Sequence, residues 1–140
     1  MSFFDKFRSF SAGPQLSESW LHPQTAGDID AIFEESAGDK NTLYLIYKHS
    51  FSCGICSYSL RRLEERFGDF SPHVKPYFID VRAQRALSNR VAEKSGVAHQ
   101  SPQAILLYDG AVYWSDSHGG VRAEPVLESL EELGIRGKKS

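Results

Sequence analysis

The feature that most constrains this chain is its pair of cysteines, Cys53 and Cys56, which are the only two in 140 residues. They directly follow a strand-like segment: residues 43–47 form a short, continuous apolar run rich in strand-forming side chains, as in a strand buried on both faces. A stretch with apolar residues at helical spacing comes after them. A C-x-x-C pair between a strand and a helix is typical of a redox-active dithiol.

Hydrophobic periodicity and turn residues predict alternating helices and strands along most of the chain. The first helix is expected to be capped by Asp28 and to end at Gly38, and the helix after the cysteines is expected to end at Gly68. Asp109-Gly110 is a strong two-residue hairpin signal. The expected strands are 43–47, 74–81, 103–108 and 111–114. The expected helices are 28–38, a helix that starts at Cys53 and stops at Gly68, 83–94 and 123–133, with Gly96 and Gly134 at the ends of the last two.

This order predicts an α/β fold with a mixed four-stranded sheet and helices on both faces. The first two strands alternate with helices, which favours parallel pairing, whereas the last two form an antiparallel hairpin. We expect an N-terminal extension over residues 1–27, loosely organised and punctuated by glycine and proline. The domain is expected over 28–134, with a tail over 135–140. Four phenylalanines of the extension recur at roughly helical spacing and are expected to pack on the domain: Phe3, Phe4, Phe7 and Phe10.

Composition excludes several classes of protein. The formal net charge of -2 and the absence of a basic run beyond Lys138-Lys139 argue against a nucleic-acid partner. No segment is apolar over the length needed to span a bilayer, and the aromatic N-terminus is broken by charges, unlike a secretory signal. We therefore expect a cytoplasmic protein. A weak membrane-surface helix at the N-terminus is the alternative interpretation of that segment.

The position of Cys53 fits a catalytic nucleophile. A thiol attacks as its thiolate, and the free N–H groups at a helix N-terminus lower a cysteine pKa. Cys56, about one turn later, is expected to lie deeper and to resolve the mixed disulfide that Cys53 forms. Gly54 is expected to allow a tight turn and the close approach of a partner. No cofactor is required, because the cysteines carry the electrons themselves.

Two residues upstream of the cysteines are candidates for tuning the pKa of Cys53. Lys48 and His49 each carry a group that favours a thiolate when it is positively charged. The alternatives are that Lys48 is a solvated charge at a strand end and that His49 is a hydrogen-bonded loop residue. The sequence leaves both alternatives open.

Ser101-Pro102 directly precedes the predicted strand at residues 103–108. A proline that enters a strand is an ordinary edge feature, whereas a cis-proline loop beside the cysteines would let a substrate backbone pair with it. The C-x-x-C on the preceding strand–helix unit favours the cis interpretation over the low general frequency of such bonds. Candidate substrate-binding residues are therefore Ser52, Gly54, Ile55, Ser101 and Pro102.

Other readings of the cysteine pair remain open. A zinc site needs four ligands and one C-x-x-C supplies two, while His49, His99 and His118 match no common zinc spacing, so we predict no metal. A pair of buried structural thiols is a second reading. A third is a redox-sensing or stress-associated binding module, whose cysteines switch partner affinity without turnover.

Several segments together resemble the YtxJ-like family, the monothiol bacilliredoxins of bacillithiol-producing bacteria. The similarity runs from about residue 20 to residue 130. It is carried by K-H-S-x-x-C at residues 48–53 and H-x-S-P-Q-A at residues 99–104, with further matches at 91–97 and 113–118. The strand, C-x-x-C, helix and later proline before a hairpin also resemble the thioredoxin pattern.

The resemblance implies a thioredoxin-like fold and attack on mixed disulfides between proteins and a low-molecular-weight thiol such as bacillithiol. The family's nucleophile corresponds to Cys53 and its cis-proline to Pro102. His99, Gln103 and His118 are either lining residues of the thiol-binding groove or local hydrogen-bonding residues. The family's usual motif reads like T-C-P-I-S, so serine is replaced here by Cys56 and proline by Gly54. A resolving thiol extends the expected partners to proteins with ordinary disulfides.

Overall fold

The computed structural model describes residues 16–135 and contains one mixed four-stranded sheet. Its strand order is β2-β1-β3-β4, with β1 parallel to β2 and antiparallel to β3, and with β3 and β4 joined as an antiparallel hairpin. The predicted fold class is confirmed. The elements are α2 (Ala26–Ser36), β1 (Leu43–His49), α3 (Gly54–Glu64), α4 (Phe67–Phe70), β2 (Val74–Asp80), α5 (Arg85–Ser95), β3 (Gln103–Tyr108), β4 (Ala111–Ser117), the 3-10 helix η1 (His118–Gly120) and α6 (Glu124–Leu133).

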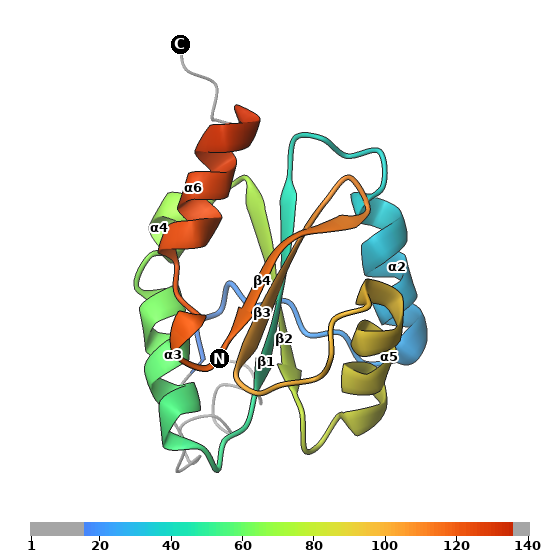
Figure 1. Ribbon diagram of the computed structural model, residues 1–140, viewed down its shortest axis with the longest axis vertical. Helices are drawn as coiled ribbons and strands as arrows, with labels where there is room; N and C mark the ends of the chain where they lie inside the picture. The colour runs from blue at the N-terminus through green and yellow to red at the C-terminus, as the bar shows by residue number, and fades with distance from the viewer. Residues whose placement is uncertain (1–15, 136–140) are drawn as a thin grey trace, which may run out of the picture.

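The sheet is covered by helices on both faces. Helices α3, α4 and α6 lie on one side and α2 and α5 on the other (Figure 1). Every residue of β1 is buried, and its side chains alternate between the two layers. Leu45 and Tyr47 belong to the core beneath α3 and α6, whereas Tyr44 and Ile46 belong to the core beneath α2 and α5. This alternation explains why the strand reads as a continuous apolar run.

Three of the predicted turn and end signals are confirmed by left-handed backbone. Asp109 and Gly110 have φ of 53° and 80°, as the two central positions of a tight hairpin turn require. Gly96 and Gly134 cap α5 and α6 with φ of 75° and 70°. These are the positions where a glycine, or an aspartate that tolerates positive φ, is needed.

Two helix-end predictions were wrong. Thr25, not Asp28, is the N-cap of α2, and Asp28 is its partner in a capping box: the Thr25 hydroxyl accepts from the Asp28 amide, and the Asp28 carboxylate accepts from the Thr25 amide. Gly68 does not end the helix after the cysteines. That helix, α3, ends at Glu64, and Gly68 lies inside the separate turn α4, whose Phe70 is buried in the core.

The segment before α2 packs on the sheet. The Leu21 amide donates to the carbonyl of Pro76, and the Leu21 carbonyl accepts from Phe78, which extends the sheet beside β2. Trp20 is 3% exposed and stacks on Tyr47 with ring centroids 5.5 Å apart. The phenylalanine stripe expected to pack on the domain lies outside the described residues. Within residues 16–135, no helix has both the length and the apolar character that crossing a membrane requires.

Candidate active site

Cys53 is the N-cap residue of α3, at the point where the chain leaves β1 and starts the helix. Its side chain is partly exposed. The backbone N–H of Cys56 is the largest influence that lowers the pKa of the Cys53 thiol, and the Cys56 thiol and the Ile55 N–H act in the same direction against a smaller desolvation effect. The helix N-terminus therefore favours the thiolate at Cys53, as the sequence predicts.

Cys56 lies in the first turn of the same helix and is fully buried. Burial raises the pKa of its thiol, so it stays protonated when Cys53 ionises. Both cysteines are free thiols. The pair thus combines one accessible, acidic thiol with one buried, less acidic thiol, which is the asymmetry needed for attack by the first and resolution by the second.

The loop before β3 lies against this pair. In this loop, Ser101 Oγ is 3.6 Å from Cys56 Sγ. The peptide bond between Ser101 and Pro102 is cis. The Pro102 carbonyl accepts from the amide of His118, at the start of η1. Of the candidate substrate-binding residues, the structure therefore places Ser101, with Pro102 next to it, beside Cys56, which lies in the helix that begins with Gly54 and Ile55.

The backbone at Gly54 differs from the expectation. Gly54 is the first residue of α3 and has no positive φ, and a Cβ added to it would meet nothing within 4 Å. The tight turn expected there is an ordinary helix start, which does not require glycine.

Lys48 is not the solvated charge that one interpretation predicted. Its side chain is completely buried, on the face of β1 opposite Tyr47 and α3. The ammonium Nζ donates to the carbonyl of Ser88, 3.1 Å away, and lies 3.2 Å from Nδ1 of His99. Burial lowers the pKa of Lys48 to about 8. Its contacts connect it to α5 and the His99 loop, not to the thiols.

His49 lies on the thiol side of the sheet and is also completely buried. Its Nδ1 is 2.8 Å from the Tyr47 hydroxyl, which donates its proton to the backbone carbonyl of Cys56 at 3.1 Å. Because a hydroxyl has one proton, His49 Nδ1 must be the donor to Tyr47. Burial lowers the pKa of His49 to about 4. His49 is therefore neutral near pH 7 and supplies no positive charge to the thiolate.

The other histidines and the glutamine singled out by the sequence lie around the proline loop. His99 is exposed, and its Nδ1 is 3.0 Å from Ser88 Oγ. Gln103 is buried, pairs with Lys48 in the sheet and donates to the carbonyl of Ala98. His118 is exposed at the end of β4. In the described part of the chain, no group of three or more His, Cys, Asp or Glu side chains is placed to hold a metal ion.

Comparison with known proteins decides the family. A protein-family model described as Monothiol bacilliredoxin BrxC matches residues 24–126, which is well over half of the chain. The chain belongs to the BrxC monothiol bacilliredoxin family.

Solved structures agree with this assignment at the level of the fold. This bacilliredoxin family member is similar to thioredoxin O2 from Arabidopsis thaliana in its oxidised state, with a TM-score of 0.63 and 18% identity over 84% of this chain and 96% of that one. Fasciola hepatica thioredoxin gives 0.58 and 20% over 80% and 97%. Trypanosoma brucei brucei thioredoxin gives 0.63 and 15% over 84% and 92%. The fold is that of thioredoxins, and the family makes this a thioredoxin-like redox protein.

This bacilliredoxin carries a second thiol although its family is described as monothiol. Cys56 occupies a fully buried position beside Ser101. Two further residues of the site are not predicted from the sequence. Tyr47 has the pattern of a core residue, although strand alternation puts its side chain on the same face of the sheet as that of His49. Nothing in the sequence predicts that Arg82 reaches Ser52, where Nη1 lies 3.4 Å from Oγ.

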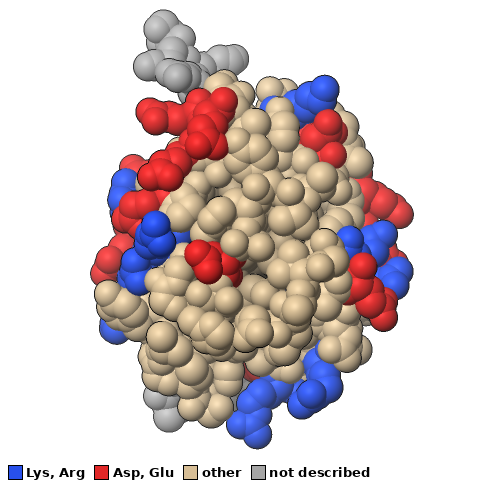
Figure 2. All heavy atoms as spheres, in the orientation of Figure 1, with Lys and Arg blue, Asp and Glu red and all other residues tan. Residues whose placement is uncertain are grey.

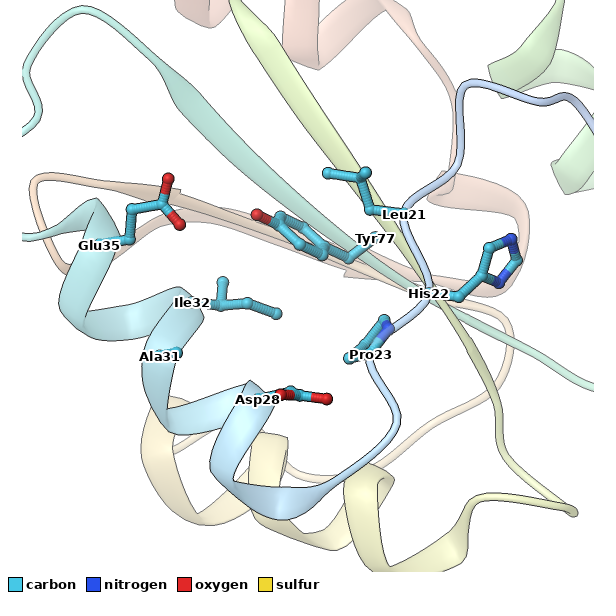
Figure 3. Close-up of a pocket in the computed structure, with 8 residues that line it drawn as sticks. All are labelled: Leu21, His22, Pro23, Asp28, Ala31, Ile32, Glu35 and Tyr77. Atoms are coloured by element: carbon cyan, nitrogen blue, oxygen red, sulfur yellow. The ribbon is translucent and has the colours of Figure 1, made fainter.

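A separate groove lies between α2 and the segment that pairs with β2 (Figure 3). Tyr77 forms its floor, and Leu21 and Ile32 project into it from opposite sides. The groove contains no thiol, and its Asp28 is occupied as the capping partner of Thr25.

Proposed function

We propose that this protein is a thiol–disulfide oxidoreductase that reduces mixed disulfides between proteins and a low-molecular-weight thiol such as bacillithiol, and also ordinary protein disulfides. The observation that carries the proposal is the pairing of an activated Cys53 at the start of α3 with a buried Cys56 one turn away. Reduction as the working direction assumes a reducing compartment, and we retain the cytoplasm as part of the proposal.

The first step is attack by the Cys53 thiolate on the sulfur of the low-molecular-weight thiol in the mixed disulfide. The target cysteine leaves as a thiolate and takes up a proton, and Cys53 becomes linked to the small thiol. In the second step Cys56 loses its proton and attacks the Cys53 sulfur. The small thiol is released in reduced form, and a Cys53–Cys56 disulfide remains.

The reduced enzyme is regenerated when an external thiol or dithiol reductant supplies two electrons to this disulfide. Without Cys56, a second molecule of the small thiol must attack the Cys53 adduct, which is the monothiol route that the family description implies. Cys56 lets this chain release the small thiol from Cys53 without a second molecule of that thiol. The proposal therefore distinguishes it from a strictly monothiol bacilliredoxin.

The test is turnover on a carrier protein whose single cysteine is capped with a small thiol, in the presence of a regenerating reductant. We expect many cycles from the wild type, none from Cys53→Ser, and, when no reductant or free thiol is added, a trapped Cys53 adduct in Cys56→Ser. Equal residual activity in both variants would refute the assigned roles. A single reaction per molecule despite the reductant would favour the redox-sensing binding module instead.

A further inference from the structure

The end of the molecule that holds Cys53 carries arginines without carboxylate partners. Arg82 lies in the connection from β2 to α5, and Arg85 is the first residue of α5; both are exposed. Neither makes an ion pair among residues 16–135. By contrast, Arg90 further along α5 is paired with Asp30. Figure 2 shows blue atoms gathered at this lower end of the view, with only a small area of red atoms visible above them.

Arg82 reaches the residue next to the nucleophile. Its Nη1 is 3.4 Å from Ser52 Oγ, and the Ser52 hydroxyl is in turn 3.1 Å from Ser50 Oγ. Because Ser52 directly precedes Cys53 and adjacent Cα atoms are only about 3.8 Å apart, the guanidinium reaches the backbone neighbour of the nucleophile.

Arg85 extends the positive surface toward the proline loop. Its charge and that of Lys48 act on His99, where desolvation and these two cations together lower the pKa of the imidazole. His99 begins the segment that leads to Ser101 and Pro102. Arg85 therefore lies near enough to the loop that begins at His99 for its charge to act there, while Arg82 reaches Ser52.

Asp80, the acidic residue nearest to these arginines in the chain, already accepts hydrogen bonds from the backbone. Asp80 accepts the backbone N–H groups of Arg82 and Ala83 on Oδ1, so it caps the connection instead of pairing with a guanidinium. The whole chain has a net charge of -2, so this local excess of positive charge does not follow from composition. Guanidinium groups are suited to binding carboxylates through two parallel hydrogen bonds.

We infer that Arg82 and Arg85 form a carboxylate-binding subsite that selects small thiols bearing carboxylate groups when they are transferred to Cys53. This inference rests on the proposed function and specifies its substrate chemistry. The subsite holds the small thiol during the first attack, when the Cys53–sulfur bond forms and the bond to the target cysteine breaks. It leaves the exposed apolar side chains of Phe51, Ile55 and Tyr58 for contact with the protein partner.

The test measures the first attack alone, in the Cys56→Ser background, with three symmetrical disulfides that differ in charge. These are glutathione disulfide, which bears carboxylates, hydroxyethyl disulfide, which is neutral, and cystamine, which is cationic. The rate of adduct formation on Cys53 is followed by mass spectrometry. Arg82→Gln and Arg85→Gln are compared with Arg61→Gln, which removes an exposed arginine without an ion pair from the far end of α3.

We expect each of the two variants to slow reaction with glutathione disulfide by about five-fold, the scale of one exposed ion pair. Reaction with hydroxyethyl disulfide should change little, reaction with cystamine should quicken, and Arg61→Gln should behave as the wild type. Equal slowing with all three disulfides would overturn the inference, because the arginines would then act on the Cys53 thiolate and not on the ligand.

Three other outcomes can be told apart. If arginine dependence appears only with a mixed disulfide to an acidic peptide, the subsite belongs to the protein partner and the inference is overturned. If none of the disulfides forms an adduct with Cys53 in any variant, the proposed function itself fails. Uniform adduct rates across the three charges would refute the subsite while leaving the proposed function intact.

Discussion

The hydroxyl of Tyr47 donates to the backbone carbonyl of Cys56 across 3.1 Å, and so it ties the sheet to the first turn of the helix that carries both thiols. Tyr47 also receives the Nδ1 proton of His49 at 2.8 Å. Burial raises the pKa of Tyr47, so it remains a donor at all working pH values. This hydrogen bond therefore anchors the backbone of Cys56 to strand β1.

Replacing Tyr47 with phenylalanine should leave the buried His49 N–H without a partner, and the Cys56 carbonyl should keep only its hydrogen bond within α3. A buried polar group without a partner costs about 1–3 kcal/mol, so we expect the free energy of unfolding to fall by that amount. Urea denaturation measures it. The release of a small thiol from the Cys53 adduct should also slow, because Cys56 is less well held.

The matched control for that change is Tyr44→Phe. Tyr44 is equally buried but lies on the opposite face of β1, where its hydroxyl donates to Asp39. Tyr44→Phe should lower stability without affecting release of the small thiol. If both variants slow release equally, the effect of Tyr47 is general destabilisation and not positioning of Cys56.

His49 should make stability depend on pH in the acid range. Its pKa is lowered to about 4 in the folded protein, against about 6.5 in the unfolded chain. Between these values the unfolded state binds more protons, so this stabilising contribution is complete above about pH 6.5 and is lost as the pH falls toward 4. The loss amounts to roughly 3 kcal/mol.

Urea denaturation at several pH values between 4 and 7.5 tests this for the wild type and for His49→Phe. The variant should lose less stability on acidification than the wild type. His118→Gln, at an exposed histidine, should keep the wild-type dependence. Parallel curves for wild type and His49→Phe would show that His49 does not titrate as its burial requires.

Lys48→Met should leave the pKa of Cys53 unchanged. Lys48 lies on the far face of β1, with its ammonium on Ser88 and His99, so removal of its charge does not reach the thiol. Because a buried charge carries a desolvation cost, an apolar replacement of similar length should change the free energy of unfolding by only about 1 kcal/mol. Thiolate absorbance against pH measures the first claim, and a Cys53 pKa raised in the variant would contradict it.

Gly54→Pro should be tolerated and stabilising. Gly54 is the first helical residue, where proline is favoured, and Cys53 before it has ψ of 122°, which is compatible with a following proline. We expect the free energy of unfolding to rise by about 0.4–1 kcal/mol. Gly54→Ala is the control without the ring. A loss of stability with proline alone would show that the Gly54 backbone is not free to take the ring.

Local signals in the sequence were sufficient to predict most of the fold. The apolar run of β1, the Asp109-Gly110 turn and the terminal glycines of α5 and α6 each depend on neighbouring residues only. One error is local: the N-cap of α2 is Thr25, which forms a capping box with Asp28 three residues later. The other comes from a tertiary contact: Gly68 has the local signature of a helix end, but packing of Phe70 into the core starts a second turn there.

In the candidate site, too, features set by neighbouring residues were predictable and features set by tertiary contacts were not. The positions of Cys53 and Cys56 followed from the C-x-x-C between a strand and a helix. The burial of Lys48 did not, because it depends on a carbonyl and a histidine supplied from α5 and the next loop. The contact between Arg82 and Ser52 joins residues 30 positions apart, and no local pattern predicts it.

The most direct test is the pH dependence of alkylation of Cys53 in the native protein, with Cys53→Ser and Cys56→Ser measured beside it. The arrangement at the start of α3 predicts that Cys53 reacts rapidly near neutral pH and has a pKa below the ordinary thiol value of about 8.5. Cys56 should react slowly and titrate above that value. If Cys53 also titrates at or above about 8.5, it is not an activated nucleophile, and the account of this protein as a thiol–disulfide oxidoreductase is contradicted.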